Sequence, residues 1–272
     1  MSTIKIALIV QNCQAGNYEK NLESTMHFIS IAIEKGAQFI VFPEMNLTGY
    51  VTDESVISIS KSPTEDMLSL FKGMAKSSQS TIMVGLAEKT SNKNIYASHL
   101  IFSPDGSSDI YRKIHISSFE KQFYSAGNTI SVFNSHGLIF GVQLCYDAHF
   151  PELSLAMASK QADVIFIPHA SPRGTSQEKF DSWVRHLRAR AFDNGLYIAA
   201  VNQAGDNEKG LIFPGLCLFI GPDGNIIYKS IDGSEGVHIV TIDKNILKAV
   251  RSHPMRYFLP NRRTDLFQSF YS

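Results

Sequence analysis

Short, mainly apolar runs alternate in this chain with segments whose apolar residues recur at helical spacing. Residues 4–10 and 39–42 form two such runs of strand length, and Pro43 ends the second. The helix predicted between them ends at Gly36. Its buried face is expected to consist of Leu22, Met26, Ile29 and Ile33. Strands that alternate with helices in this way predict an α/β fold.

The tripeptide Pro-Asp-Gly occurs twice between apolar runs, at residues 104–106 and 222–224. It is a hairpin signal, and a hairpin pairs its two strands antiparallel, so the sheets are expected to be mixed. The residues Ser62-Pro63-Thr64-Glu65 predict a capping box with Pro63 at the first helical position. The further strands are predicted at 81–86, 138–142, 164–167, 197–201 and 237–242, and the further helices at about 151–160 and 179–193.

No linker or shift in composition divides the 272 residues. The sequence therefore predicts a single domain, 1–272, with an irregular C-terminal tail from about residue 251. The large apolar residues of this tail are Tyr257, Phe258, Leu259, Phe267, Phe270 and Tyr271. Because exposed aromatic residues need a covering surface, we expect a homodimer or a larger homo-oligomer.

Composition excludes several classes of partner. The 25 basic and 25 acidic residues balance, so no overall field would recruit nucleic acid or an anionic membrane surface, and a small-molecule substrate is expected. No apolar run approaches the length that spans a bilayer. Three widely separated cysteines argue against a disulfide framework and favour a cytoplasmic location. The histidines show no metal-binding spacing, and we expect no metal or cofactor.

Three chemically active residues stand where predicted strands end. Glu44 follows the run at 39–42, Lys113 ends the strand of the first hairpin, and Cys145 follows the apolar run at 138–142. Ligands of α/β sheets bind beyond the carboxyl ends of strands, so an acid, an amine and a thiol could meet there. Taken singly, each has an ordinary explanation. Glu44 could cap a turn, Lys113 could be solvated, and Cys145 could be a small core residue.

The motifs around these three residues resemble the nitrilase superfamily of carbon–nitrogen hydrolases. They are Val41–Tyr50 (VFPEMNLTGY), Tyr111–His115 (YRKIH) and Cys145–Glu152 (CYDAHFPE), and similar segments run from the first strand to about residue 242. The resemblance implies a four-layer α-β-β-α sandwich of two mixed, six-stranded sheets. It also implies a catalytic triad of Glu44, Lys113 and Cys145, with Glu120 at the position of a second acid.

The implied chemistry is hydrolysis of the C–N bond of a small amide through a thioester, with release of ammonia. Cys145 would attack the carbonyl carbon, and Glu44 would take the thiol proton and later deliver one to the leaving nitrogen. Lys113 is a cation and cannot act as a base, so it is expected to hold the oxyanion together with the backbone N–H of Tyr146. Glu120 would hold Lys113, although it could also be a surface carboxylate.

The residues after Cys145 bear on the substrate. Asp147 resembles the amidase and carbamoylase branches, since nitrile-cleaving members usually have Trp-Glu at 146–147. Related enzymes that bind a substrate carboxylate often have an arginine at 148 or 149, where this chain has Ala148 and His149. This difference argues against a carboxylate on the substrate and leaves a small neutral or cationic amide as an alternative. Arg173, on a loop, could replace that arginine or could be solvated. The remaining candidates for the pocket lining are Tyr50, Phe123, Tyr146 and His149.

Two alternatives remain open from the sequence. An N-carbamoyl amine or amino-acid amidohydrolase would use the same triad and differ only in its pocket. A catalytically silent member would act as a binding protein, although the presence of all three triad residues argues against this. The physiological substrate and the size of the oligomer do not follow from the sequence.

Overall fold

Two six-stranded sheets form the centre of the molecule, in a computed structural model that describes residues 3–267. The first sheet has the order β14 (Gly236–Asp243), β1 (Thr3–Val10), β2 (Phe39–Val41), β3 (Thr81–Lys89), β4 (Ile95–Phe102) and β5 (Ser108–Arg112). The second has the order β13 (Ile226–Gly233), β12 (Gly215–Ile220), β9 (Tyr197–Asn202), β8 (Val164–His169), β7 (Leu138–Val142) and β6 (Val132–Ser135).

Both sheets are mixed, as predicted. The central strands β1, β2 and β3 of the first sheet are parallel, and so are β7, β8 and β9 of the second. The outer strands pair antiparallel, among them the two Pro-Asp-Gly hairpins β4–β5 and β12–β13. A small ribbon of β10 (Gly205–Asp206) and β11 (Ile212–Phe213) lies outside the two sheets.

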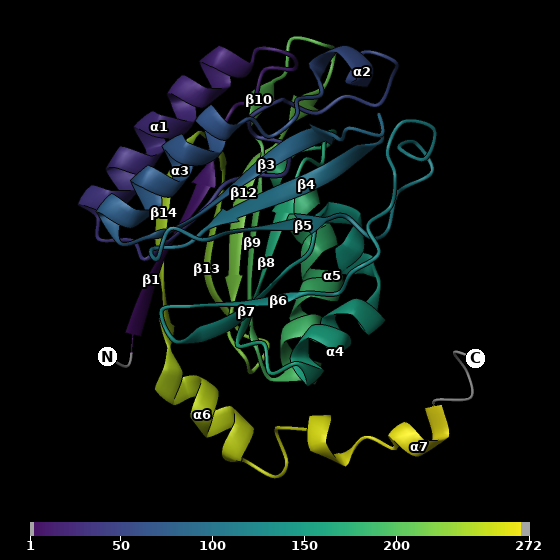
Figure 1. Cartoon of the computed structure of the whole chain (residues 1–272). Coiled ribbons are helices and arrows are strands. Elements are labelled where there is room, and N and C mark those ends of the chain that lie inside the picture. Colours follow the sequence, from purple (N-terminus) through teal and green to yellow (C-terminus); the bar gives the residue numbers. More distant parts are fainter. Residues whose placement is uncertain (1–2, 268–272) are drawn as a thin grey trace.

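Helices cover the outer face of each sheet (Figure 1). Helices α1 (Tyr18–Glu34) and α3 (Glu65–Ser78) lie on the first sheet, and α4 (Pro151–Ser159) and α5 (Ser176–Asn194) lie on the second. Alternation along β1 explains the layers, because Ile6 and Leu8 join the core between the sheets while Ala7 and Ile9 join the core beneath the helices. Between the sheets, the ring of Phe39 packs 5.4 Å from that of Phe140. The predicted α-β-β-α order of layers is confirmed.

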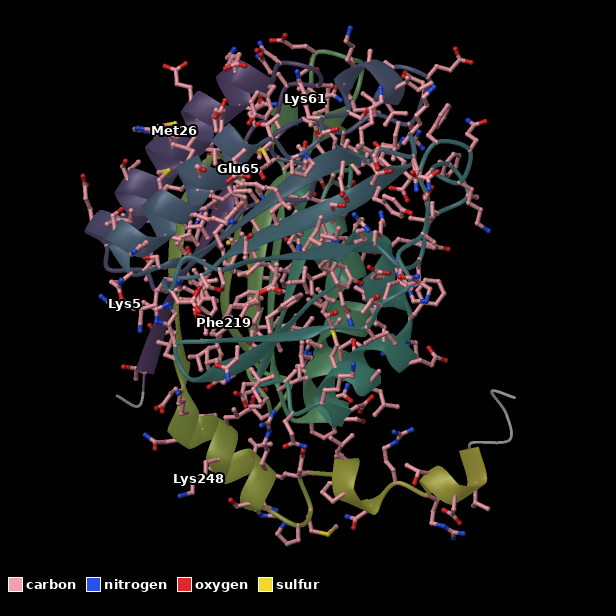
Figure 2. All side chains as sticks on the ribbon, in the orientation of Figure 1. Lys5, Met26, Lys61, Glu65, Phe219 and Lys248 are labelled. Atoms are coloured by element: carbon pink, nitrogen blue, oxygen red, sulfur yellow. The ribbon has the colours of Figure 1, made fainter. Side chains whose placement is uncertain are left out.

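The buried face of α1 differs from the prediction. Its buried residues are Asn21, Thr25, Ile29 and Ala32. Met26 and Ile33, which were expected to be buried, are 38% and 36% exposed. Figure 2 labels Met26 on α1. The polar side chains face inward because the Thr25 hydroxyl accepts hydrogen bonds from the buried amides of Gln11, at 3.2 Å, and Asn46, at 2.9 Å.

Shorter elements complete the described chain. They are α2 (Val56–Ile59), the 3-10 helix η1 (Cys145–His149), α6 (Lys244–Ser252), η2 (Leu259–Asn261) and α7 (Thr264–Phe267). In the tail, Leu259 packs against the core and Phe258 contacts Phe192, while Phe270 and Tyr271 lie outside the described residues. No helix among residues 3–267 is long and apolar enough to cross a membrane.

Candidate active site

The carboxyl ends of strands bring the acid and the amine into direct contact. Glu44 lies three residues beyond β2, and Lys113 follows β5 directly. Their side chains form an ion pair with 2.9 Å between Nζ and Oε1, and each side chain is only 1% exposed. A buried charge needs a partner, so this contact explains how both groups can be ionised inside the protein.

Glu44 is held in place through its side chain and its backbone. The Ala170 N–H, just after β8, donates to Oε2 at 3.0 Å, and the Gln203 side chain donates to the Glu44 carbonyl oxygen at 2.7 Å. The pKa of Glu44 is raised to about 7, because burial and the charge of Glu120 raise it by more than Lys113 and the Ala170 N–H lower it. A carboxyl group with this pKa can both accept and donate a proton near neutral pH.

Lys113 lies between two carboxylates. Its Nζ is 2.8 Å from Oε1 and 3.1 Å from Oε2 of Glu120, in addition to the contact with Glu44. Burial lowers the pKa of Lys113, but the two carboxylates more than offset this, and the pKa rises well above its usual value. Lys113 is therefore a fixed cation, suited to stabilising negative charge rather than to accepting a proton.

Glu120 is a buried residue and not the surface carboxylate considered above. It is 2% exposed and accepts hydrogen bonds from the Ser117 N–H at 3.0 Å and the Tyr50 hydroxyl at 3.2 Å. Burial raises its pKa, but Lys113 and Ser117 lower it by more, and the net shift is downward. Glu120 is thus the permanently ionised partner of Lys113, while Glu44 is the carboxyl group that titrates near neutrality.

Cys145 begins η1 in a strained backbone conformation. Its φ of +44° lies in the left-handed region, where a residue with a Cβ is uncommon and costs energy. Burial raises the pKa of the Cys145 thiol, Glu44 raises it further, and Lys113 opposes this, so all three groups interact electrostatically. The thiol is therefore protonated at rest and needs a base during attack, which Glu44 can supply.

Asp147 joins the segment of Lys113 to the segment of Cys145. This fully buried carboxylate accepts hydrogen bonds from the Tyr111 hydroxyl at 2.8 Å, the His115 N–H at 2.8 Å and the Leu144 N–H at 3.1 Å. The Nδ1 atom of His115 lies 2.9 Å from Oδ1. Sequence reasoning treated Asp147 only as a marker of substrate class. Its place inside the motif at 145–152 gave no signal that it would contact the motif at 111–115.

Comparison with known proteins identifies the family. The model of the carbon–nitrogen hydrolase family matches residues 5–252. The chain belongs to this family. It is 29% identical to a nitrilase of Pyrococcus abyssi, covering 97% of this chain and 99% of that protein, and 27% identical to an (R)-stereoselective amidase of a Pseudomonas species, covering 91% and 88%. The predicted family and hydrolase class are confirmed.

Solved structures of the family share the fold. A carbon–nitrogen hydrolase from Helicobacter pylori superposes with a TM-score of 0.87 at 24% identity and covers 99% of this chain and 98% of that one. An amidase from Nesterenkonia sp. superposes with a TM-score of 0.84 at 22% identity and covers 98% and 96%. These likenesses agree with the two packed six-stranded sheets of this carbon–nitrogen hydrolase.

The expected pocket residues lie in different surroundings. Tyr50 is buried and joins the ion cluster through Glu120, and Phe123 is half-buried against the core. Tyr146 and His149 are exposed on η1, with ring centroids 5.6 Å apart, and Tyr146 lines a cavity of about 470 Å³ beside the active-site motifs. Arg173 is exposed on the loop after β8. The structure therefore unites Tyr50 with the ion cluster, whereas Tyr146 and His149 lie on η1, Arg173 lies on this loop, and Phe123 packs against the core.

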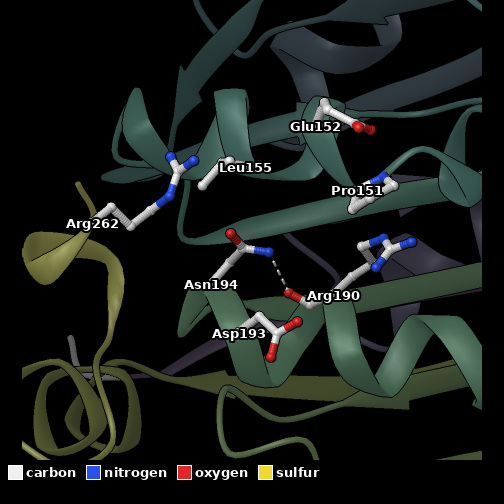
Figure 3. A pocket seen from close by; sticks show the side chains of 7 residues that line it. All are labelled: Pro151, Glu152, Leu155, Arg190, Asp193, Asn194 and Arg262. Atoms are coloured by element: carbon white, nitrogen blue, oxygen red, sulfur yellow. Dashed lines mark hydrogen bonds between the residues drawn. The ribbon is translucent and has the colours of Figure 1, made fainter. Parts of the chain in front are cut away.

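A second cavity, of about 290 Å³, lies between α4, α5 and the C-terminal segment (Figure 3). It is lined by Pro151, Glu152, Leu155, Arg190, Asp193, Asn194 and Arg262. None of the candidate catalytic residues lines this cavity. Among residues 3–267, no group of three or more histidine, cysteine or carboxylate side chains is arranged to hold a metal ion.

Proposed function

We propose that this carbon–nitrogen hydrolase cleaves a small linear amide through a thioester on Cys145 and releases ammonia. The observation on which this rests is the buried cluster of Glu44, Lys113 and Glu120, which interacts electrostatically with the Cys145 thiol at the start of η1, beyond β7 of the other sheet. An ammonium held between two carboxylates serves no packing purpose that apolar side chains would not serve as well, so the cluster points to chemistry.

In the first step the sulfur of Cys145 bonds to the amide carbon while Glu44 takes the thiol proton. The carbonyl oxygen becomes an oxyanion, which Lys113 and the backbone N–H of Tyr146 stabilise. The C–N bond then breaks as Glu44 returns its proton to the nitrogen, because ammonia leaves only when it is protonated. The acyl group remains on the sulfur as a thioester.

Water completes the cycle. Glu44, again a carboxylate, takes a proton from a water molecule whose oxygen bonds to the thioester carbon. The C–S bond breaks, the proton returns to the sulfur, and a carboxylic acid is released. The pKa of about 7 suits Glu44 to both directions of proton transfer. Glu120 keeps Lys113 in position throughout.

The names of relatives support an amide substrate. They include the (R)-stereoselective amidase above and an omega-amidase of Xenopus laevis, 28% identical over 98% of both chains. In one solved structure, of a variant of the amidase from Nesterenkonia sp. AN1, the acetamide moiety of fluoroacetamide is bound covalently to the active-site cysteine. An N-carbamoylputrescine amidase of Solanum lycopersicum is 28% identical over 91% of this chain. An N-carbamoyl compound is therefore the second candidate for the substrate.

An ammonia-release assay across aliphatic amides, N-carbamoyl amines and nitriles tests the proposal. We expect turnover of amides and its loss in Cys145→Ala, because no other group would form the thioester. Cys13→Ala is the matched control, since Cys13 is a buried cysteine outside the site, and it should keep its activity. Undiminished turnover in Cys145→Ala would exclude the thioester mechanism, and turnover confined to N-carbamoyl compounds would favour the second candidate.

A further inference from the structure

We propose that Asn207, in the turn of the β10–β11 ribbon, is a positioning residue that holds the Tyr50 hydroxyl on the pair of Glu120 and Lys113. The inference rests on the proposed amidase function and deepens it. Asn207 lies outside the motifs that contain the catalytic triad. It is nevertheless only 1% exposed, whereas the residues on either side of it, Asp206 and Glu208, are exposed. A buried polar side chain in an exposed turn needs partners inside the protein.

The side chain of Asn207 has two kinds of partner. Its Oδ1 accepts hydrogen bonds from the N–H groups of Lys209, at 2.9 Å, and Leu211, at 3.0 Å, and these bonds shape the turn. Its Nδ2 donates to the carbonyl oxygen of Tyr50 at 2.8 Å. Asparagine is common in turns because its side chain bonds the backbone a few residues further on. The bond to Tyr50 is different, since it joins the ribbon to a segment 157 positions away in the sequence.

Tyr50 is held by the ribbon at its backbone and at its ring. Besides the bond from Asn207, Phe213 of β11 packs against the ring edge-on, with the centroids 6.3 Å apart. Gly49, just before Tyr50, lies so close to Ala15 that a Cβ on it would overlap the Ala15 backbone, and the Ala15 N–H donates to the Asn207 carbonyl oxygen at 2.9 Å. A tyrosine side chain rotates about only two bonds, so these contacts also fix its hydroxyl group.

The hydroxyl group of Tyr50 connects the ribbon to the ion cluster. It donates to Oε1 of Glu120 at 3.2 Å, and the same oxygen lies 2.8 Å from Lys113 Nζ. The ammonium is in turn 2.9 Å from Oε1 of Glu44. A displaced Tyr50 would leave the Glu120 carboxylate free to turn against the ammonium. Because small misplacements of catalytic groups slow the chemical step, Asn207 affects the reaction without touching the reacting atoms.

An aspartate at position 207 separates this role from the shaping of the turn. Asn207→Asp keeps an oxygen that can accept from the N–H groups of Lys209 and Leu211. It removes the N–H donor to Tyr50, and a carboxylate oxygen would then face the Tyr50 carbonyl oxygen and repel it. A residue that only closed the turn would tolerate this change. A residue that positions Tyr50 would not.

A double-mutant cycle with Tyr50→Phe tests the inference. The measured quantities are kcat and KM for the aliphatic amide with the highest turnover in the ammonia-release assay. We expect Asn207→Asp to lower kcat roughly tenfold or more, with KM changed by less than about threefold. In the Tyr50→Phe background, which has no hydroxyl group to position, the same substitution should lower kcat by less than about threefold. Equal factors in both backgrounds would overturn the inference, because a general loss of stability acts independently of the hydroxyl group.

Asn134→Asp is the matched control. It makes the same change at an exposed asparagine on β6 and should leave kcat unaltered. Urea denaturation checks that each variant is folded under the assay conditions. If Asn207→Asp does not fold, Phe213→Leu takes its place in the cycle, because it removes the ring that packs on Tyr50 and keeps an apolar side chain. We expect the same dependence on the Tyr50 hydroxyl group, and equal losses with and without that group would again overturn the inference.

Alkylation by iodoacetamide separates this inference from the proposed function. The reaction requires removal of the Cys145 proton but no cleavage of an amide. Mass spectrometry of peptides gives its rate at Cys145, with the buried Cys13 and Cys217 as internal references. Asn207→Asp should slow alkylation of Cys145 roughly tenfold, and only when Tyr50 is present. If no amide is hydrolysed, the amidase proposal fails, and alkylation still decides the role of Asn207. An unchanged rate in Asn207→Asp would overturn that role.

Discussion

Glu44 and Glu120 contact the same ammonium of Lys113, yet their pKa values are shifted in opposite directions. Glu44 is fully buried, and burial raises its pKa to about 7, whereas Lys113 and the Ser117 N–H bring the pKa of Glu120 below its usual value. Two carboxyl groups whose pKa values differ in this way can serve different functions in one site. In the proposed mechanism, Glu120 keeps the lysine charged and fixed, and Glu44 exchanges the proton.

The activity should therefore depend on the ionisation of Glu44. Since the base must be a carboxylate, kcat/KM is expected to rise with pH and to level off above an apparent pKa near 7. Rate measurements from pH 5 to 9 check this. Glu44→Gln should lose most activity at every pH, because an amide cannot accept the thiol proton. A flat profile in the unmodified protein between pH 5 and 7 would contradict the assignment.

Asp147 is a second residue whose role can be tested. Asp147→Asn replaces one acceptor oxygen with an NH₂ group that faces N–H or O–H donors, so buried donors lose their partner at about 1–3 kcal/mol. We expect a lower free energy of unfolding, measured by urea denaturation. We also expect kcat to fall by roughly tenfold or more, because misplacement of catalytic groups slows the chemical step. Full activity in this variant would show that the segments of Lys113 and Cys145 keep their places without Asp147.

At the scale of elements, the turn that contains Glu44 depends on a glycine in the neighbouring strand. A Cβ on Gly85 of β3 would overlap the backbone nitrogen of Met45. Gly85→Ala must therefore displace this turn. We expect a loss of stability of about 1–3 kcal/mol and a fall in activity.

Gly73→Ala is the matched control for Gly85→Ala. Gly73 lies inside α3, and a Cβ there would meet nothing within 4 Å. Alanine is the better helix former, so this change should stabilise the protein by about 0.5–1 kcal/mol without affecting turnover. Thermal unfolding and ammonia release measure both effects. Equal effects of the two substitutions would argue against a specific role of Gly85.

The elements also show what a sequence can and cannot predict. The strands at 138–142 and 164–167 were found because their apolar runs have no competing helical period, although β8 continues to His169. The start of α3 was misjudged, because Thr64 caps the helix by accepting from the Met67 N–H, and Pro63 lies before the helix rather than at its first position. Local patterns locate elements, but capping contacts decide where each begins.

Interactions between distant segments were the least predictable. The inward rotation of Thr25 depends on amides at Gln11 and Asn46, which no helical pattern within α1 could reveal. In the candidate site, the family motifs indicated Glu44, Lys113 and Cys145, but the link from Lys179 to the loop after β8 had no local signal. The hydrogen bonds of Lys179 join residues that lie outside the motifs around Cys145, so those motifs could not predict them.

At the scale of the whole molecule, large apolar side chains remain on the surface near the C-terminal segment. Phe258 and Phe192 contact each other while 40% and 44% exposed, and Met255 is 76% exposed. We therefore expect a homodimer or a larger assembly, because a second copy would cover this surface. Sedimentation velocity should give at least twice the chain mass of 30.2 kDa. A species of single-chain mass at micromolar concentration would contradict the expectation.

The pairing of β14 with β1 affects how the chain can be made. Residues 3–112 supply five strands of the first sheet, but the sixth, Gly236–Asp243, is translated last and pairs along the whole of Thr3–Val10. Until the ribosome has released it, one edge of β1 stays open to other chains. Fragments that stop short of residue 236 should therefore aggregate, and an added peptide comprising the missing strand should rescue them.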